Sequence, residues 1–246
     1  MPLGGRPHQR ASGSLKLTYR AEYHAPWRSI GPASAFLPAG DPAALQRALD
    51  ASTLRYVELE VASDGEVELA ARELVNVAAC FVEPIQGEGG VHEIERDSLL
   101  QLRAAADRHG FPLVFDEIQS GMGRTGRFFA SEHAGVVGDY YLLSKALGGG
   151  LAKISALLVA RDRYLEEFGY LHTSTFADDD FSSEVALAAL DLVEENDGAL
   201  MGRCAATGEL LLGRLRDLMA RYPDQIRAVR GRGLMVGVEL ADQRDS

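Results

Sequence analysis

One lysine stands out in this sequence as a candidate nucleophile. The chain has only three lysines among its 25 basic residues, and Lys145 lies between the apolar run 140–143 and the glycines 148–150. Burial disfavours the charged form of an amine, so a lysine at the end of a buried strand can react near neutral pH. Its natural reaction is Schiff-base formation with an aldehyde, most often pyridoxal phosphate. The alternative interpretation is a solvated lysine at a strand end.

Two carboxylates occupy equivalent positions after other apolar runs. Glu83 follows residues 78–82, and Asp116 follows residues 112–115. In an open α/β sheet, ligands bind at the carboxyl ends of the strands. Each residue alone could be a solvated strand end, but three ionisable groups at one sheet edge predict a site formed by Glu83, Asp116 and Lys145.

The elements that must position these groups alternate between strands and helices. Apolar runs predict strands over 54–61, 78–82, 112–116, 140–143, 154–160 and 233–240. Helical spacing predicts helices over 42–50, 66–75, 97–109 and 182–221. The last of these helices should be interrupted at 196–198. Asp97 is the predicted N-cap of its helix and Gly110 its stop. Because 78–116 forms a strand, helix and strand, its two strands should be parallel with a right-handed crossover, as in an α/β fold.

Residues 121–126 match the GxGxxG pattern of dinucleotide-binding folds. That pattern has to leave a strand directly and open a helix at its third glycine. Here residues 116–120 intervene after the strand, and Arg127-Phe128-Phe129 gives no clear helix start. We therefore do not expect a dinucleotide site.

Composition limits the classes of partner and compartment. The formal net charge of -11 argues against nonspecific binding to nucleic acid or to an anionic membrane. No apolar stretch approaches the roughly 20 residues that span a bilayer, and the start lacks the apolar core of a signal peptide. The two cysteines, Cys80 and Cys204, form no CxxC, and the histidines show no metal-ligand spacing. We expect a cytoplasmic protein with no metal.

Three segments, taken in order, resemble the signatures of class III pyridoxal-phosphate-dependent aminotransferases of the ornithine, acetylornithine and GABA type. They are Glu83-Pro84-Ile85-Gln86-Gly87-Glu88-Gly89-Gly90, Asp116-Glu117-Ile118-Gln119-Ser120-Gly121-Met122-Gly123-Arg124-Thr125-Gly126 and Ser144-Lys145-Ala146-Leu147-Gly148-Gly149-Gly150. The 29-residue step from Asp116 to Lys145 also resembles that of the family. Residues 172–176 are similar to its later phosphate-binding segment, and the resemblance runs from about residue 20 to 240.

The resemblance implies a role for each matching residue. Lys145 would hold pyridoxal phosphate as a Schiff base and then move the substrate proton. Asp116 would pair with the pyridine nitrogen, which keeps that nitrogen protonated, and Gln119 would contact the ring oxygen or the ring face. Thr175 would bind the cofactor phosphate, usually in the partner subunit of a homodimer. Glu88 would lie near the substrate, and Glu83 would support the site.

The resemblance further implies a fold-type I large domain, a mostly parallel sheet between helices. We expect an incomplete large domain over residues 1–197 and the start of a small C-terminal α/β domain over 198–246. Family members are longer, so both ends would be truncated. They carry an upstream Ser-Gly-Ser/Thr phosphate loop, and we interpret Ser12-Gly13-Ser14 as a coincidental match because its spacing to Glu83 is too short.

The expected activity is ping-pong transfer of an amino group from an amine or amino acid to a 2-oxo acid or aldehyde. Departures from the family pattern at 138–139, 151–153 and 176–183 weaken any transfer of substrate specificity. An aminomutase or racemase that uses the same cofactor is the enzymatic alternative. A non-catalytic fragment or dimerising scaffold is the alternative outside enzymes.

Overall fold

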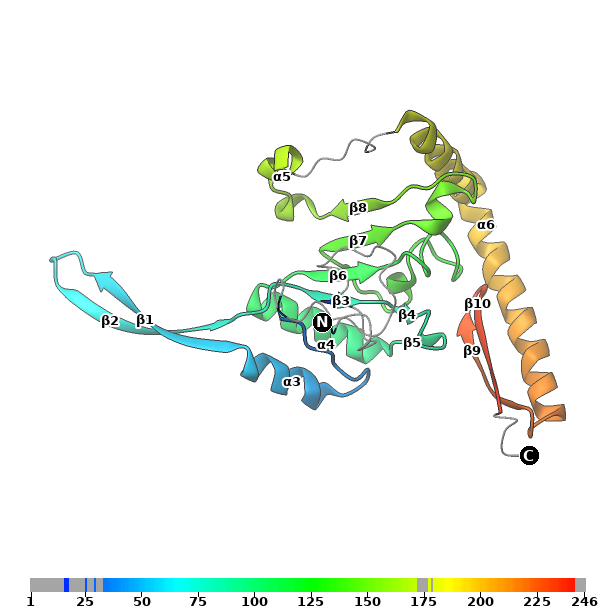
Figure 1. The fold of residues 1–246 in the computed structure, drawn as a ribbon, viewed down its shortest axis with the longest axis horizontal. Coiled ribbons are helices and arrows are strands. Elements are labelled where there is room, and N and C mark those ends of the chain that lie inside the picture. Colours follow the sequence, from blue (N-terminus) through cyan, green and yellow to red (C-terminus); the bar gives the residue numbers. More distant parts are fainter. Residues whose placement is uncertain are drawn as a thin grey trace.

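The computed structural model describes residues 16–17, 25, 29, 33–171, 177 and 179–241 (Figure 1). Its helices are α3 (Pro42–Ala51), α4 (Arg96–His109), α5 (Glu166–Leu171) and α6 (Asp180–Arg221), with short 3-10 helices η2 (Ala130–His133), η3 (Lys145–Gly148) and η4 (Arg161–Arg163). Its strands are β1 (Thr53–Val61), β2 (Val67–Val75), β3 (Cys80–Val82), β4 (Ile85–Gln86), β5 (His92–Glu93), β6 (Leu113–Asp116), β7 (Tyr140–Leu143), β8 (Ala156–Val159), β9 (Ile226–Arg232) and β10 (Met235–Leu240). In this part of the chain, no helix is long and apolar enough to cross a membrane.

The central sheet has four strands in the order β3, β6, β7, β8. Strands β3, β6 and β7 are parallel, whereas β8 runs antiparallel to β7. The predicted parallel pairing across residues 78–116 is therefore confirmed. Because parallel strands end at the same edge, the residues that follow β3, β6 and β7 meet on one side of the molecule.

The main core lies between this sheet and α4. Leu99, Leu102 and Ala106 of α4 are buried in one cluster with residues of β3 and β6, including the fully buried Phe115. Gly110 ends α4 in the left-handed conformation with φ 75°, as predicted. The predicted N-cap was wrong, because Glu95 occupies the cap and Asp97 lies in the first turn, where its charge still favours the helix N-terminus.

Residues 67–75 form strand β2, so the prediction of a helix over 66–75 was wrong. The strand pairs antiparallel with β1 over its whole length, from Thr53 opposite Val75 to Val61 opposite Val67. The turn between them is closed by the Asp64 carboxylate, which accepts from the Glu66 amide, and by Gly65 at φ 89°. The apolar residues at 67, 70, 71 and 74 also suit helical spacing, but pairing with a neighbouring strand decides the outcome.

The β1–β2 arm, residues 53–75, extends away from the body of the molecule (Figure 1). One face of its outer half is apolar. Each of five residues on this face is 61–73% exposed, namely Val57, Leu59, Val61, Val67 and Leu69. Glu58, Glu60 and Arg72 lie on the opposite face, where Arg72 pairs with both glutamates. Contiguous exposed apolar surface of this kind usually marks an interaction site.

Helix α6 changes direction where the sequence predicted an interruption. Residues 195–198 have non-helical backbone angles, with φ 75° at Gly198. The part after this kink packs against the antiparallel β9–β10 hairpin, which Figure 1 shows alongside it. Gly208 of α6 approaches the backbone of Gly233 so closely that a side chain at 208 would overlap it. Strand β9 was not predicted from the sequence.

Candidate functional site

The carboxyl ends of β3, β6 and β7 bring the predicted residues together. Glu83 follows β3, Asp116 is the last residue of β6, and Lys145 follows β7 after one residue. Their charges act on one another, since the ionisation of Glu83 is influenced by Asp116, Lys145 and Glu88. Three predicted residues, Glu83, Asp116 and Lys145, therefore share one edge of the sheet. The charge of Glu88, in the loop between β4 and β5, also acts there.

Lys145 has an unusual backbone conformation at this edge. Its φ of 45° lies in the left-handed region, which is rare for residues other than glycine and recurs at functional sites. The preceding Ser144 anchors the turn, because its hydroxyl donates to the Ile154 carbonyl at 3.0 Å and its carbonyl accepts from the Leu147 amide at 3.0 Å. Loss of hydration lowers the pKa of the Lys145 amine, while the carboxylates of Glu88, Asp116 and Glu83 oppose that change.

Glu83 is a carboxyl group that resists ionisation. Burial raises its pKa to about 8, and the nearby charges of Asp116 and Glu88 act in the same direction. The Gly87 amide, which donates to Glu83 Oε2 at 3.2 Å, and the Lys145 amine oppose this shift. Near neutral pH the side chain is therefore mostly protonated and can donate a hydrogen bond into the site.

The segment after Asp116 is fixed by a buried acid that sequence reasoning missed. Glu117 is 1% exposed and accepts hydrogen bonds from the Ser120 hydroxyl at 2.6 Å and from the amides of Ala130 and Ser131 at 3.0 and 2.9 Å. Burial raises its pKa. These contacts tie the turn that carries Gln119 to the 3-10 helix η2. Their partners lie up to 14 residues away, so no local sequence pattern indicated them.

Gln119 lies against the glycine-rich loop that follows Glu83. A β-carbon placed on Gly87 would overlap the side-chain amide of Gln119, so a larger residue there would require Gln119 to move. Asp116 is held at the same turn, where its Oδ1 accepts from the Ile118 amide at 3.1 Å. The arrangement puts a carboxylate and an amide next to the loop that bears Glu88.

The glycines of the 121–126 turn serve helix packing. A β-carbon on Gly126 would approach the Ala205 β-carbon to 2.7 Å, and one on Gly123 would lie 2.9 Å from Met201. Both partners belong to α6. The two glycines therefore let this turn sit directly against the helix.

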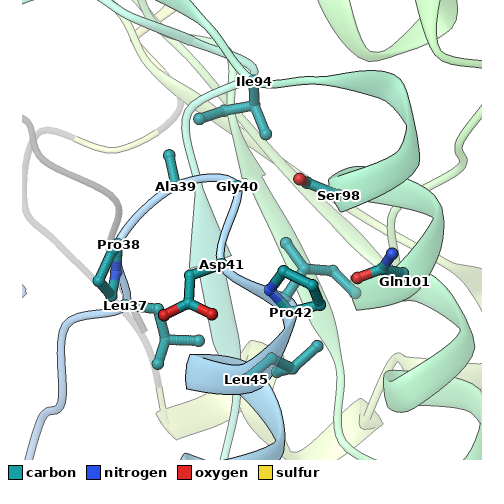
Figure 2. A pocket seen from close by; sticks show the side chains of 11 residues that line it. Leu37, Pro38, Ala39, Gly40, Asp41, Pro42, Leu45, Ile94, Ser98 and Gln101 are labelled. Carbon is teal, nitrogen blue, oxygen red and sulfur yellow. The ribbon is translucent and has the colours of Figure 1, made fainter.

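The predicted phosphate-binding residue Thr175 lies outside the described residues, as does the whole segment 172–176. A separate pocket is visible between the loop before α3 and the start of α4 (Figure 2). Its lining includes the apolar residues Leu37, Pro42, Leu45, Ile94 and Leu102, with Ser98 and Gln101 at one side. None of the predicted site residues lines it. Among the described residues, no group of three or more His, Cys, Asp or Glu could hold a metal ion.

Comparisons with known proteins identify structures of similar fold. Ornithine aminotransferase from Toxoplasma gondii ME49 is 28% identical, with a TM-score of 0.80 over 99% of this chain and 52% of its own. A second Toxoplasma gondii structure, 28% identical with a TM-score of 0.75 over 97% of this chain and 51% of its own, is described as having partial occupancy of pyridoxal phosphate at its active site. Acetylornithine aminotransferase from Elizabethkingia anophelis is 32% identical, with a TM-score of 0.67 over 86% of this chain and 47% of its own.

This chain thus spans about half the length of these proteins. The predicted fold class is confirmed, since the central sheet and its helices form part of a fold-type I large domain. The family model for class III aminotransferases matches residues 5–246. With the ordered motifs around Glu83, Asp116 and Lys145 and a match over nearly its whole length, the chain belongs to the class III aminotransferase family.

Proposed function

We propose that this chain is a pyridoxal-phosphate-dependent aminotransferase. It would move an amino group from an amine or amino acid to a 2-oxo acid or aldehyde by a ping-pong mechanism. The observation that carries the proposal is the Lys145 amine, which has a lowered pKa and lies among Asp116, Glu83 and Glu88 at one sheet edge. The proteins named above support the choice of reaction.

The residues at this edge fit the cofactor. Lys145 offers an amine for covalent attachment, and Asp116 offers a carboxylate for the pyridine nitrogen. Gln119 is packed against Gly87, where a larger residue would displace it. When bound, pyridoxal phosphate supplies an electron sink for the carbanion that forms when the substrate loses a proton.

The residues of the chain would then divide the remaining work. The lowered pKa of Lys145 increases the fraction of neutral amine, which is the form that takes up a proton from the substrate carbon. With the cofactor bound, Asp116 would offer its carboxylate to the ring nitrogen and would favour the protonated form of that nitrogen. Glu83, protonated near pH 7, donates a hydrogen bond without adding a second negative charge beside Asp116. Glu88 balances the charge of the lysine when Lys145 is protonated.

The test is product analysis with the whole chain. The purified protein, mixed with pyridoxal phosphate, is incubated with a panel of amino acids and primary amines, including ornithine and acetylornithine. We expect stoichiometric release of an oxo acid or aldehyde, and none with Lys145→Ala. An isomerised product without an oxo compound would indicate an aminomutase or racemase. Binding of the cofactor without any product would indicate a non-catalytic fragment, which the half-length match motivates.

We also propose that residues 1–197 belong to the large domain and that 198–246 begin a second one. The non-helical backbone at 195–198 supports this boundary. The first part of α6 packs through Ala186 and Val193 in one buried cluster with Leu143 of β7 and Leu147 of η3. The second part packs with β9 and β10.

We propose that the chain forms a homodimer in which the apolar face of the β1–β2 arm is covered by a second copy. An uncharged face needs an uncharged partner surface, and an identical arm supplies one by two-fold symmetry. Sedimentation at micromolar concentration should show a dimer. Leu69→Glu should weaken it about tenfold or more because the charge enters the apolar face, whereas Ala70→Glu, on the opposite face, should not. A wild-type monomer would contradict the proposal.

We further propose a cytoplasmic location. Its support is compositional, together with Cys80 and Cys204, which form no disulfide with each other in the described part of the chain. Cysteines outside disulfides suit a reducing compartment. Fractionation of cells that express the chain would test this location. The chain should be found in the cytosolic fraction, while a membrane-bound protein used as a control stays in the membrane fraction.

A further inference from the structure

The loop that carries Glu88 has a strained backbone. Strands β4 and β5 pair antiparallel, so residues 87–91 turn the chain back on itself. Val91 has φ 59° in this loop. A β-branched residue in the left-handed region is costly and persists only where the surrounding structure holds it. Hydrogen bonds within the loop, such as the Val91 amide to the Gln86 carbonyl at 2.9 Å, account for part of that support.

The β9–β10 hairpin supplies the rest of the support through Arg230. Its Nε donates to the Gly90 carbonyl at 2.6 Å, and its Nη2 donates to Glu239 Oε2 at 2.6 Å. The Arg230 side chain is 25% exposed and that of Glu239 is 37% exposed, so the pair is partly shielded from water. A guanidinium is rigid and presents donors in fixed directions, which suits it to hold a carbonyl on one side and a carboxylate on the other.

Two further contacts join the hairpin to the same loop. Arg232 pairs with Glu93 of β5 at 2.8 Å. Gly237 of β10 faces Val91 so closely that an added β-carbon would lie 3.0 Å from the Val91 β-carbon. Figure 1 shows β4 and β5 beside the hairpin. The hairpin therefore contacts the loop at Gly90 and Val91 and the adjoining strand β5 at Glu93, through residues about 140 positions later in the chain.

This loop faces the proposed cofactor lysine. Glu88 lies two residues before Gly90, and its charge acts directly on Lys145. Gly87, at the other end of the loop, donates its amide to Glu83. A change in the loop would alter both carboxylates that flank the lysine, while Asp116 on β6 would keep its place.

We propose that Arg230 is a positioning residue: by holding the Gly90 carbonyl, it fixes the loop 87–91 and thereby the position of Glu88 beside Lys145. The role of Arg230 in holding the loop does not depend on the proposed function. Only its consequence for catalysis rests on the proposed cofactor site. Without Arg230, the Gly90 carbonyl loses its donor and Val91 relaxes from the left-handed region. The loop then moves Glu88 away from the amine.

The test uses two measurements on the cofactor-free chain. The first is amide hydrogen exchange, which reports opening of residues 87–91. The second is the pH dependence of Lys145 acetylation, followed by peptide mass, with Lys16 and Lys153 as internal references. The charged groups that act on Lys145 are Glu88, Asp116 and Glu83.

We expect Arg230→Ala to speed exchange of the Gly90 and Val91 amides about tenfold or more. It should also lower the pH midpoint of Lys145 acetylation by about half a unit, because withdrawal of a nearby negative charge disfavours the protonated amine. Arg230→Lys should restore part of both effects, since an ammonium keeps the charge and can donate but lacks the rigid, planar donor geometry of a guanidinium. Arg227→Ala is the matched control, because Arg227 lies on the same strand and pairs with Glu239 at 3.7 Å.

A second variant keeps the inference testable if Arg230→Ala fails to fold. Gly237→Ala leaves Arg230 in place but presses on Val91, and it should also speed exchange in the loop. Unchanged exchange in both variants would overturn the proposal. Faster exchange with an unchanged acetylation profile would overturn the positioning of Glu88. If no variant, including wild type, binds pyridoxal phosphate, the proposed function fails while these two measurements still decide the role of Arg230.

Discussion

Alanine in place of Lys145 will abolish covalent attachment of pyridoxal phosphate to the chain. After borohydride reduction, the wild-type protein should carry the cofactor on the peptide that contains residue 145, and the variant should carry none. The expected loss is complete because the bond requires a primary amine. Of the three amines in lysine side chains, Lys145 is the one that lies with Asp116, Glu83 and Glu88.

Lys153→Ala is the matched control for this experiment. Lys153 is exposed and lies eight residues beyond Lys145, outside the strand end where the carboxylates meet. Its replacement should leave the labelled peptide and the visible absorption of the bound cofactor unchanged. Cofactor trapped on Lys16 or Lys153 in the wild-type protein would show that Lys145 is not the attachment site. A folded wild-type chain that traps no cofactor would remove the basis for the proposed activity.

Glutamine in place of Glu83 will stabilise the cofactor-free chain at pH 8 and leave its stability near pH 5 almost unchanged. The pKa of Glu83 is about 8 in the folded chain, against 4.5 for an ordinary glutamate. Between these values the unfolded chain releases a proton that the folded chain keeps. The free energy of unfolding of the wild type therefore falls as the pH rises from 4.5 to 8.

Glutamine removes this penalty because it does not ionise. It also retains an oxygen that can accept from the Gly87 amide, as Glu83 does at 3.2 Å. Each unit of pKa difference corresponds to about 1.4 kcal/mol, so a difference of roughly 3.5 units makes the gain at pH 8 on the order of 4 kcal/mol. Urea unfolding of wild type and Glu83→Gln at pH 5 and pH 8 measures it. The same difference at both pH values would show that Glu83 ionises normally in the folded chain, and NMR titration of its carboxyl would check this directly.

Part of the fold follows from local sequence. Continuous apolar runs at 78–82, 112–115 and 140–143 are typical of strands that are buried on both faces of a sheet. These runs correspond to strands β3, β6 and β7. The kink at 196–198 was visible because Asn, Asp and Gly tolerate left-handed backbone. The sequence alone therefore predicted that the residues at the ends of those strands, Glu83, Asp116 and Lys145, lie close together.

Other parts depended on neighbours that are distant in sequence. Residues 66–75 suit a helix as well as a strand, and only pairing with β1 selects β2. Strand β9 contains three arginines and a glycine, so it lacks an apolar signal and exists through its partner β10. Thr175 stays a prediction, because it lies outside the described residues.

The sequence by itself determined which ionisable residues follow the parallel strands β3, β6 and β7, because the apolar runs and the polar residues that end them are local features of the chain. Tertiary structure alone decided how those residues are held. Glu117 binds backbone amides 13 and 14 positions away, and Arg230 reaches a carbonyl 140 positions earlier. The free energy of a buried hydrogen bond depends on the geometry of both partners and on the exclusion of water, and neither is encoded in the spacing of residue types.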